Sequence, residues 1–266
     1  MLKGSGGFEV KLSELFKNNK VFIPYITAGD PDLETTEKLI YTLEKAGADA
    51  IELGIPFSDP IADGPVIQKA QHRALVAGTT LKKIFTMVGR VRQQSSVPLL
   101  FMMSYNSVIQ FGQTAFIQAL KDHDIGGLVV PDLPFEESAP LCSELKAFSI
   151  PVISFVAPTT SPQRIKKITQ KANGFIYLIS STGVTGERQT IETSVNDIIK
   201  NIKRTKEIPI AVGFGISTPE MAKRVAQFAD GIIIGSAIVK IIEAQKQDCI
   251  DSVYEFAKSV KVALLK

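Results

Sequence analysis

The sequence predicts an α/β protein, a (β/α)8 TIM barrel, and two observations support this prediction. Short apolar runs rich in β-branched residues recur eight times, and segments with helical periodicity separate them. Each run is largely apolar on both alternating faces, which is typical of a parallel sheet covered on both sides. Eight such units in 266 residues fit one barrel domain, so we expect a single domain over residues 1–266.

The eight expected strands are distributed along nearly the whole chain. A doubly wound open sheet is the alternative, but G-x-G-x-x-G does not follow the first run and no linker leads to a second domain. The barrel is therefore favoured. Its expected strands are Val21–Thr27, Ala50–Leu53, Pro98–Ser104, Gly127–Pro131, Val152–Val156, Gly174–Ser180, Ile208–Gly213 and Gly231–Gly235.

The segments between the strands carry helix signals. Leu33–Ala46 places its apolar residues on one face and its charges mostly on the other. Thr160-Ser-Pro-Gln163 and Ser217-Thr-Pro-Glu220 fit capping boxes, in which the first residue caps a helix with proline in its first turn. We also expect a helix over Val66–Ala77, a short N-terminal helix, and a short extra helix at Ser236–Ala244 after the last strand.

Composition limits the classes of function. The 45% hydrophobic and 21% charged residues are typical of a soluble globular protein. The net charge of +3, without a dense Lys/Arg block, argues against nucleic-acid or membrane-surface binding. No apolar run could span a bilayer, and the first twenty residues lack a signal-peptide core. Cys142 and Cys249 are isolated, which indicates a reducing compartment. We expect a cytoplasmic protein of bacteria, or one of the plastid stroma.

Three glycine clusters stand at neighbouring strand ends. They are Ser181-Thr-Gly-Val-Thr-Gly186, Gly213-Phe-Gly215 and Gly235-Ser236, the last directly before the extra helix. In a barrel, working residues lie at the carboxyl ends of the strands. Exposed backbone N–H groups and a helix N-terminus both favour an anion. The clusters together predict a phosphate cradle, although any single glycine fits a simple corner equally well.

Carboxylates are the candidates for the chemistry. Glu52 stands near a strand end among apolar neighbours, where desolvation raises a pKa and suits general acid/base work. The alternative is a Glu tied to a backbone amide or a basic residue. Asp63 could bind a ligand N–H or cap the following helix. Asp59 fits an Asp-Pro turn better. For Asp132, turn formation and partner contact compete with catalysis.

Other catalytic groups are poorly placed. His72 and His123 lie on expected helices, as do both cysteines, and no His, Asp or Glu grouping has metal-ligand spacing. No lysine stands inside a strand or at its carboxyl end, so a Schiff base lacks its nucleophile. We therefore predict neither a metal nor a covalent mechanism.

Aromatic and aliphatic side chains at strand ends predict the shape of the ligand. Each one alone fits ordinary barrel filling. Together they suit a substrate with a flat aromatic group at one end and a phosphate at the other. The residues are Tyr25, Met103, Tyr105, Tyr177 and Phe214.

Several motifs resemble those of the tryptophan synthase alpha chain family, in its order and spacing, over Val10 to Leu265. The stretch with Glu52 and Asp63 is highly specific, whereas phosphate glycines occur in other barrels. The motifs are Pro24-Tyr-Ile-Thr-Ala-Gly-Asp-Pro31, Glu52-Leu-Gly-Ile-Pro-Phe-Ser-Asp-Pro-Ile-Ala-Asp-Gly-Pro65, Gly183-Val-Thr-Gly186, Gly213-Phe-Gly-Ile216 and Gly235-Ser-Ala-Ile-Val239.

The resemblance implies a lyase that splits indole-3-glycerol phosphate into indole and glyceraldehyde 3-phosphate. Glu52 matches the acid/base carboxylate and Asp63 the carboxylate that binds the indole N–H. Tyr25 aligns with an aromatic position of the indole pocket, where many relatives have Phe, and Tyr177 with a tyrosine near the catalytic carboxylate. Thr185 falls on a mobile loop. Matches to the phosphate cradle are Gly186, Gly215, Gly235 and Ser236.

The resemblance also implies a partner and no cofactor on this chain. The partner is a pyridoxal-phosphate beta chain in an α2β2 assembly, which receives indole through a tunnel. Pro56–Pro60 and Asp132–Phe135 lie on the expected catalytic face, where such a partner would dock. Three alternatives remain: another phosphate-binding barrel such as a ribulose-phosphate or histidine-pathway isomerase, a stand-alone lyase, and a non-catalytic activator of the beta chain.

Overall fold

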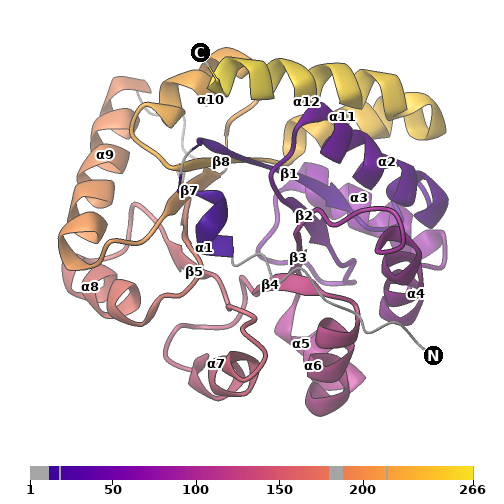
Figure 1. Cartoon of the computed structure of the whole chain (residues 1–266), viewed down its shortest axis with the longest axis horizontal. Helices are drawn as coiled ribbons and strands as arrows, with labels where there is room; N and C mark the ends of the chain where they lie inside the picture. The colour runs from indigo at the N-terminus through magenta and orange to yellow at the C-terminus, as the bar shows by residue number, and fades with distance from the viewer. Residues whose placement is uncertain (1–11, 18, 180–187, 214, 266) are drawn as a thin grey trace, which may run out of the picture.

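Eight parallel strands form a barrel inside a ring of helices (Figure 1). The computed structural model describes residues 12–17, 19–179, 188–213 and 215–265. The sheet order is β4-β3-β2-β1-β8-β7-β6-β5, and a bridge between Leu128 and Val152 joins β4 to β5. The predicted (β/α)8 barrel is confirmed. Its strands are β1 (Val21–Thr27), β2 (Ile51–Gly54), β3 (Leu99–Met102), β4 (Ile125–Val129), β5 (Ser154–Val156), β6 (Ile176–Ile179), β7 (Ile210–Gly213) and β8 (Gly231–Ile234).

The helices follow the strands in order, but two crossovers contain a pair of helices. These pairs are α3 with α4, between β2 and β3, and α5 with α6, between β3 and β4. After β8, α12 packs against both α10 and α2 and so closes the ring (Figure 1). The helices are α1 (Leu12–Leu15), α2 (Leu33–Ala46), α3 (Pro65–Val76), α4 (Leu81–Val91), α5 (Tyr105–Phe111), α6 (Gln113–Asp122), α7 (Ala139–Lys146), α8 (Pro162–Lys171), α9 (Arg188–Thr205), α10 (Pro219–Ala226), α11 (Ser236–Gln245), the 3-10 turn η1 (Lys246–Cys249) and α12 (Ile250–Leu264).

Strand alternation divides the core into two parts. On β1, Ile23 and Tyr25 belong to the cluster inside the barrel, whereas Phe22 and Ile26 pack in the outer cluster beneath the helices. All seven residues of β1 are buried. Because both faces of the strands are covered, both faces are apolar, as the sequence indicates. The same alternation points the side chain at position 52 of β2 into the barrel.

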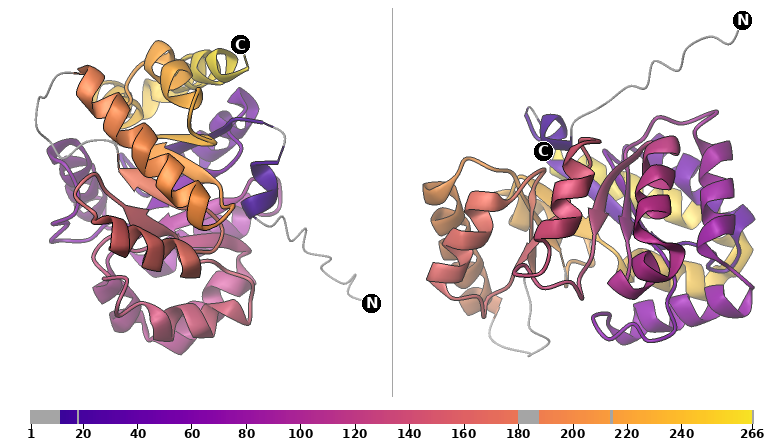
Figure 2. Two further views of the ribbon diagram at one scale, coloured as in Figure 1. Left: turned by 90° about the vertical axis from the view of Figure 1, so that its left-hand side faces the viewer. Right: turned by 90° about the horizontal axis from the view of Figure 1, so that it is seen from below.

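Helix α1 covers one end of the barrel, which leaves the other end for the site. Leu12 is buried with the inner cluster, and the ring of Phe16 lies 5.5 Å from that of Phe175. Figure 1 shows α1 over the centre of the barrel, and Figure 2 shows it at one end. Since Phe175 directly precedes β6, this is the amino-terminal end of the strands.

The two expected capping boxes were wrong by one residue. Ser161 caps α8 by accepting from the Arg164 N–H at 3.4 Å, and Thr218 caps α10 by accepting from the Met221 N–H at 3.2 Å. Thr160 instead accepts from the Ala157 N–H at 3.0 Å. Proline is favoured at the first helical position, so the residue directly before it becomes the cap. The extra helix after the last strand is confirmed as α11.

None of the described helices is long and apolar enough to cross a membrane.

Candidate active site

A cavity of about 650 Å³ opens at the carboxyl ends of the strands. Its volume is within the range expected of small-molecule sites. Two carboxylates, two tyrosines and the glycine-containing turns after β7 and β8 contribute to its wall. The residues that the following paragraphs use are Tyr25, Glu52, Asp63, Tyr177, Gly215, Gly235 and Ser236.

Glu52 is a buried carboxyl group in the wall of this cavity. It pairs with Tyr25 across β1 and β2, and only 1% of its surface is exposed. Neither carboxyl oxygen has a hydrogen-bond partner among the described residues. Burial raises the pKa of Glu52 to about 8, and the charge of Asp63 adds to the rise. Glu52 is therefore a neutral acid at pH 7, poised to give and to take a proton.

Asp63 is the second carboxylate of the cavity. Its Oδ2 accepts a hydrogen bond from Gln71 Nε2 at 2.6 Å, so its side chain is engaged on the buried side of α3. The helix cap itself is Gly64. Burial raises the pKa of Asp63 to about 6, with a further rise from Asp132, and the bond from Gln71 opposes both. Asp63 is therefore ionised at pH 7, while Glu52 is protonated. Such a separation assigns different roles to two acids in one site.

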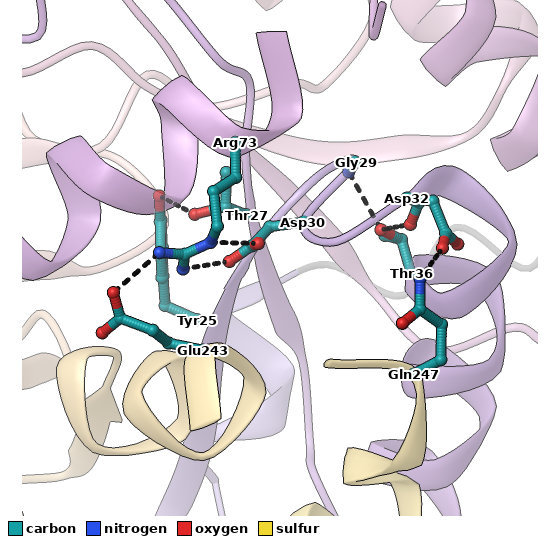
Figure 3. Close-up of polar contacts among 9 residues, drawn as sticks. All are labelled: Tyr25, Thr27, Gly29, Asp30, Asp32, Thr36, Arg73, Glu243 and Gln247. Atoms are coloured by element: carbon teal, nitrogen blue, oxygen red, sulfur yellow. Dashed lines mark hydrogen bonds and ion pairs between the residues drawn. The ribbon is translucent and has the colours of Figure 1, made fainter. Parts of the chain in front are cut away.

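Two tyrosines stand beside these acids. The Tyr25 hydroxyl lies 3.1 Å from Thr27 Oγ1, and burial raises its pKa well above the ordinary value, as the charge of Asp63 does less strongly (Figure 3). Burial and the charge of Glu52 raise the pKa of Tyr177 in the same way. A Cβ at Gly54 would overlap the Tyr25 hydroxyl, and one at Gly213 would lie 2.6 Å from the Tyr177 hydroxyl. Glycine at these two strand ends therefore leaves the space that the tyrosine hydroxyl groups occupy.

Another part of the cavity wall is suited to an anion. Gly235 is the N-cap of α11, and Ser236 begins the helix with no acidic residue in its first turn. The free N–H groups and dipole of a helix N-terminus attract negative charge. Gly215, with φ of +79°, lies in the neighbouring turn after β7. These three residues are thus brought together as the sequence predicts.

Four other candidates from the sequence are not among the described residues that line the cavity. Thr185, Gly186 and Phe214 are outside the described residues. Tyr105 packs against the outer core and donates from its hydroxyl to Gln113 Oε1 at 3.1 Å, and it is not among the residues that line the cavity. Its role in substrate binding stays a prediction.

The remaining acids have structural bonds. Asp132 accepts from Ser104 Oγ at 2.6 Å and from the Tyr105 N–H at 2.9 Å, so it fastens the start of α5 to the end of β4. The carbonyl of Asp59 accepts from the Ile61 N–H at 2.9 Å, in the turn that the sequence predicts. Neither contact involves the large cavity.

Sequence reasoning missed two residues of the site. Met102, rather than Met103, projects from β3 into the inner cluster and lines the cavity. Gln71 binds Asp63 but lies on a helix, away from any strand end. The sequence does contain a signal for Gln71. The buried face of α3 consists of Ile67, Ala70, Gln71 and Ala74, and a buried amide among apolar residues needs a polar partner.

A buried ion pair joins the elements on either side of the site (Figure 3). Arg73 on α3 donates from Nε and Nη2 to the two oxygens of Asp30, both at 2.8 Å. Its Nη1 donates to Glu243 Oε1 on α11 at 2.9 Å. Only 1% of the Asp30 side chain is exposed. Arg73 therefore ties the loop after β1 and the helix next to Asp63 to the helix that begins at Ser236.

Neither histidine lines the cavity, and His72 is exposed on α3. His123 ends α6, with Nδ1 2.8 Å from the Ala119 carbonyl and its ring 4.9 Å from that of Phe85. Within the described ranges, no three His, Cys, Asp or Glu residues are grouped so that they could hold a metal. Cys142 and Cys249 are free thiols.

Comparison with known proteins gives a consistent result. The family model described as "Tryptophan synthase alpha chain" matches residues 12–264. The protein of that name from Lacticaseibacillus casei is 45% identical over 254 residues, covering 96% of this chain and 95% of the relative. A crystal structure of tryptophan synthase subunit alpha from Legionella pneumophila has a TM-score of 0.87 at 36% identity, covering 96% and 98%. A chain of a tryptophan synthase complex from Pyrococcus furiosus has a TM-score of 0.81 at 33% identity, covering 91% and 98%.

Proposed function

Because the chain belongs to the tryptophan synthase alpha chain family, we propose that Glu52 and Asp63 are the two carboxylates that carry out its reaction. The chain is a lyase that cleaves indole-3-glycerol phosphate to indole and glyceraldehyde 3-phosphate in tryptophan biosynthesis. It acts with a beta chain, which carries the pyridoxal phosphate, and has no cofactor of its own. The roles of Glu52 and Asp63 in this chain are proposed from the geometry of the site.

The single observation that supports the assignment is the difference between the two acids. Glu52 has a pKa of about 8 and Asp63 a pKa of about 6, and both line one cavity. At neutral pH the site therefore holds one carboxylic acid and one carboxylate. Cleavage of a carbon–carbon bond at indole C3 needs both: an acid to protonate C3, and an anion to stabilise the charge that develops at N1.

The proposed reaction has two steps. Glu52 donates its proton to C3 of the indole, which becomes tetrahedral, and Asp63 accepts a hydrogen bond from the N1–H as positive charge develops on the ring. Glu52, now a carboxylate, removes the proton of the adjacent glycerol hydroxyl. The bond from C3 to the glycerol carbon breaks, its electrons return to the ring, and the aldehyde forms. Glu52 ends protonated, as it began.

The other residues hold the substrate. We assign the phosphate to Gly215, Gly235 and Ser236, with Gly186, because the turn after β7 and the N-terminus of α11 face the same cavity as the acids. Tyr25 and Tyr177 stand beside Glu52 and are assigned to the indole end. Phe214 and Thr185, which lie outside the described residues, are assigned to substrate binding as well.

The beta chain is proposed to dock on the face that carries the cavity. The loop at Pro56–Pro60 and the segment Asp132–Phe135 follow the carboxyl ends of β2 and β4. Ile61, directly after that loop, is 87% exposed, so an apolar side chain on this face is open to a partner.

Two substitutions test the roles of the acids. Glu52→Gln should reduce indole release by a factor of about 10²–10⁴, because it removes the proton carrier, while substrate binding measured by calorimetry persists. Asp63→Asn should cost about 10²–10³ through lost charge stabilisation. Glu255→Gln on α12 and Asp122→Asn on α6 are matched exposed controls and should keep the wild-type rate.

The outcomes separate the alternatives. Appreciable turnover by Glu52→Gln would remove Glu52 from the mechanism, and a near-normal rate for Asp63→Asn would reduce Asp63 to a structural role. If the wild-type chain itself released no indole, with or without a beta chain, it would be a non-catalytic activator.

Two further points belong to this proposal. One sheet contains all eight strands, which supports a single domain over residues 1–266. The relative from Lacticaseibacillus casei is bacterial, which supports a cytoplasmic enzyme, and a plastid stroma is the alternative compartment.

A further inference from the structure

Gln71 is a buried amide that the reaction described above does not use. Only 4% of its surface is exposed, and it stands on the inner face of α3, eight residues after Asp63. A primary amide in such a place is costly unless both of its ends find partners. Both ends do: one partner is Asp63, which lines the cavity, and the other is the backbone of Phe57 in the loop after β2.

The two hydrogen bonds of Gln71 fix the orientation of its amide. Its Oε1 accepts from the backbone N–H of Phe57 at 2.9 Å, and its Nε2 donates to Asp63 Oδ2 at 2.6 Å. A backbone N–H can only donate and an ionised carboxylate can only accept, so the reversed amide would satisfy neither. The Nε2 therefore presents a donor to Asp63, and a donor stabilises the charged form of a carboxyl group.

This donor acts against strong opposing effects. Burial raises the pKa of Asp63, and the nearby charge of Asp132 raises it further. The bond from Gln71 lowers it. Without that bond, the balance would shift toward a protonated Asp63, which would no longer be an anion facing the indole nitrogen.

We propose that Gln71 is the positioning residue of the site, which keeps Asp63 ionised and fixes it to the loop backbone at Phe57. The proposal rests on the role of Asp63 proposed above. Because Phe57 belongs to the loop that we assign to the beta-chain interface, one side chain joins the indole-binding acid to the docking loop. The effect of Gln71 is electrostatic as well as steric, and this separates it from a packing residue.

The pH dependence of kcat tests the proposal. Indole release is measured in the complex with the beta chain at saturating substrate, for wild type, Gln71→Met and Gln71→Glu. The methionine removes both hydrogen bonds at similar volume. The glutamate keeps an acceptor for the Phe57 N–H and replaces the donor to Asp63 by a carboxylate, so it isolates that contact if the methionine variant folds poorly.

We expect the acidic limb of kcat to move to higher pH in both variants. The shift should be about one to two pH units, the size that follows from removing a hydrogen bond to a charged group. The substrate phosphate titrates in the same range but is common to all variants, so a difference between them reports the protein. Gln118→Met is the matched control, because Gln118 makes the same kind of bond to Asp122 on the surface of α6, at 2.7 Å.

A packing role would lower kcat equally at every pH, and an unchanged acidic limb in both variants would overturn the proposal. Asp63→Asn, measured beside them, separates two failures. If Asp63→Asn is inactive while the limb of the Gln71 variants is unmoved, only the role of Gln71 fails. If Asp63→Asn is fully active, the role of Asp63 fails first.

Discussion

Glu52 and Asp63 have the same functional group and opposite protonation states at neutral pH, because their surroundings differ. Glu52 is enclosed in the inner face of β2 with no described hydrogen-bond partner, and its pKa rises to about 8. Asp63 is buried too, but it accepts a hydrogen bond from the Gln71 amide, and its pKa rises only to about 6. A carboxyl group buried in this way is ionised at a cost in folding free energy.

Glu52→Gln should therefore stabilise the protein in alkaline solution. The wild-type carboxyl has a pKa near 4.5 when the chain is unfolded and about 8 when it is folded. Between these values the folded state binds the proton more tightly, so the free energy of unfolding of the wild type falls as pH rises through this window. Glutamine does not titrate. The variant should exceed the wild type by a few kcal/mol at about pH 9 and match it closely at about pH 5.

Urea denaturation at the two pH values measures this difference. Glu255→Gln, which changes an exposed carboxyl group on α12, should show no such pH-dependent gain. A Glu52→Gln variant no more stable than the wild type at high pH would mean that Glu52 is not a destabilised acid.

The sequence predicts the surroundings of the two acids to different extents. The burial of Glu52 in the cavity wall could be predicted because it stands near the end of an apolar strand, and its functional role stays a prediction. Asp63 was identified as a candidate, but its bond to Gln71 was not predicted, since it depends on how the loop before α3 folds onto the buried face of that helix. Met102 was not predicted because the sequence does not fix which residues at the end of β3 face into the barrel. An error of one residue along a strand exchanges its inner and outer faces.

At the scale of elements, the site depends on how α3 and α11 are held. Helix α3 carries Gln71 beside Asp63, and α11 provides the N-terminus assigned to the phosphate. Arg73 binds Asp30 after β1 and Glu243 on α11, and so fixes both helices to the barrel (Figure 3). The two elements assigned to the ends of the substrate thereby share one ion-pair network.

Arg73→Met should destabilise the protein by about 3–5 kcal/mol, because it leaves the buried Asp30 carboxylate without its partner. Arg90→Met on α4 is the control. Arg90 also donates two hydrogen bonds to one carboxylate, Glu37, but its side chain is 51% exposed, and loss of that pair should cost less than about 1 kcal/mol. Denaturant unfolding measures both. Equal losses would show that Arg73 acts as an ordinary surface arginine.

The sequence predicts some boundaries of the helices correctly and others not. The bounds of α2 agree with the expected Leu33–Ala46, because its apolar face and its cap at Asp32 coincide. The predicted caps of α8 and α10 were wrong by one residue. Two hydroxyl residues stand side by side at each helix start, and the proline after the second makes that second residue the cap. The pairing of α3 with α4 and of α5 with α6 was not predicted.

At the scale of the whole molecule, the two ends of the barrel differ: one is closed by packing and the other carries the cavity. Helix α1 covers the amino-terminal end, and the acids, the turns after β7 and β8 and the docking loop lie at the other. The fold class was predictable because eight strands apolar on both faces leave few architectures. The size of the cavity was not, because it depends on how the ends of distant strands meet.

The central claim is that the reaction needs Glu52 protonated and Asp63 ionised in the same molecule. The pH dependence of kcat for indole release by the complex with the beta chain tests it most directly. From the pKa values of about 6 and about 8, kcat should rise as Asp63 ionises, pass through a maximum near neutrality and fall as Glu52 loses its proton. A kcat that stays level far above pH 8 would contradict the account, because an ionised Glu52 has no proton to give.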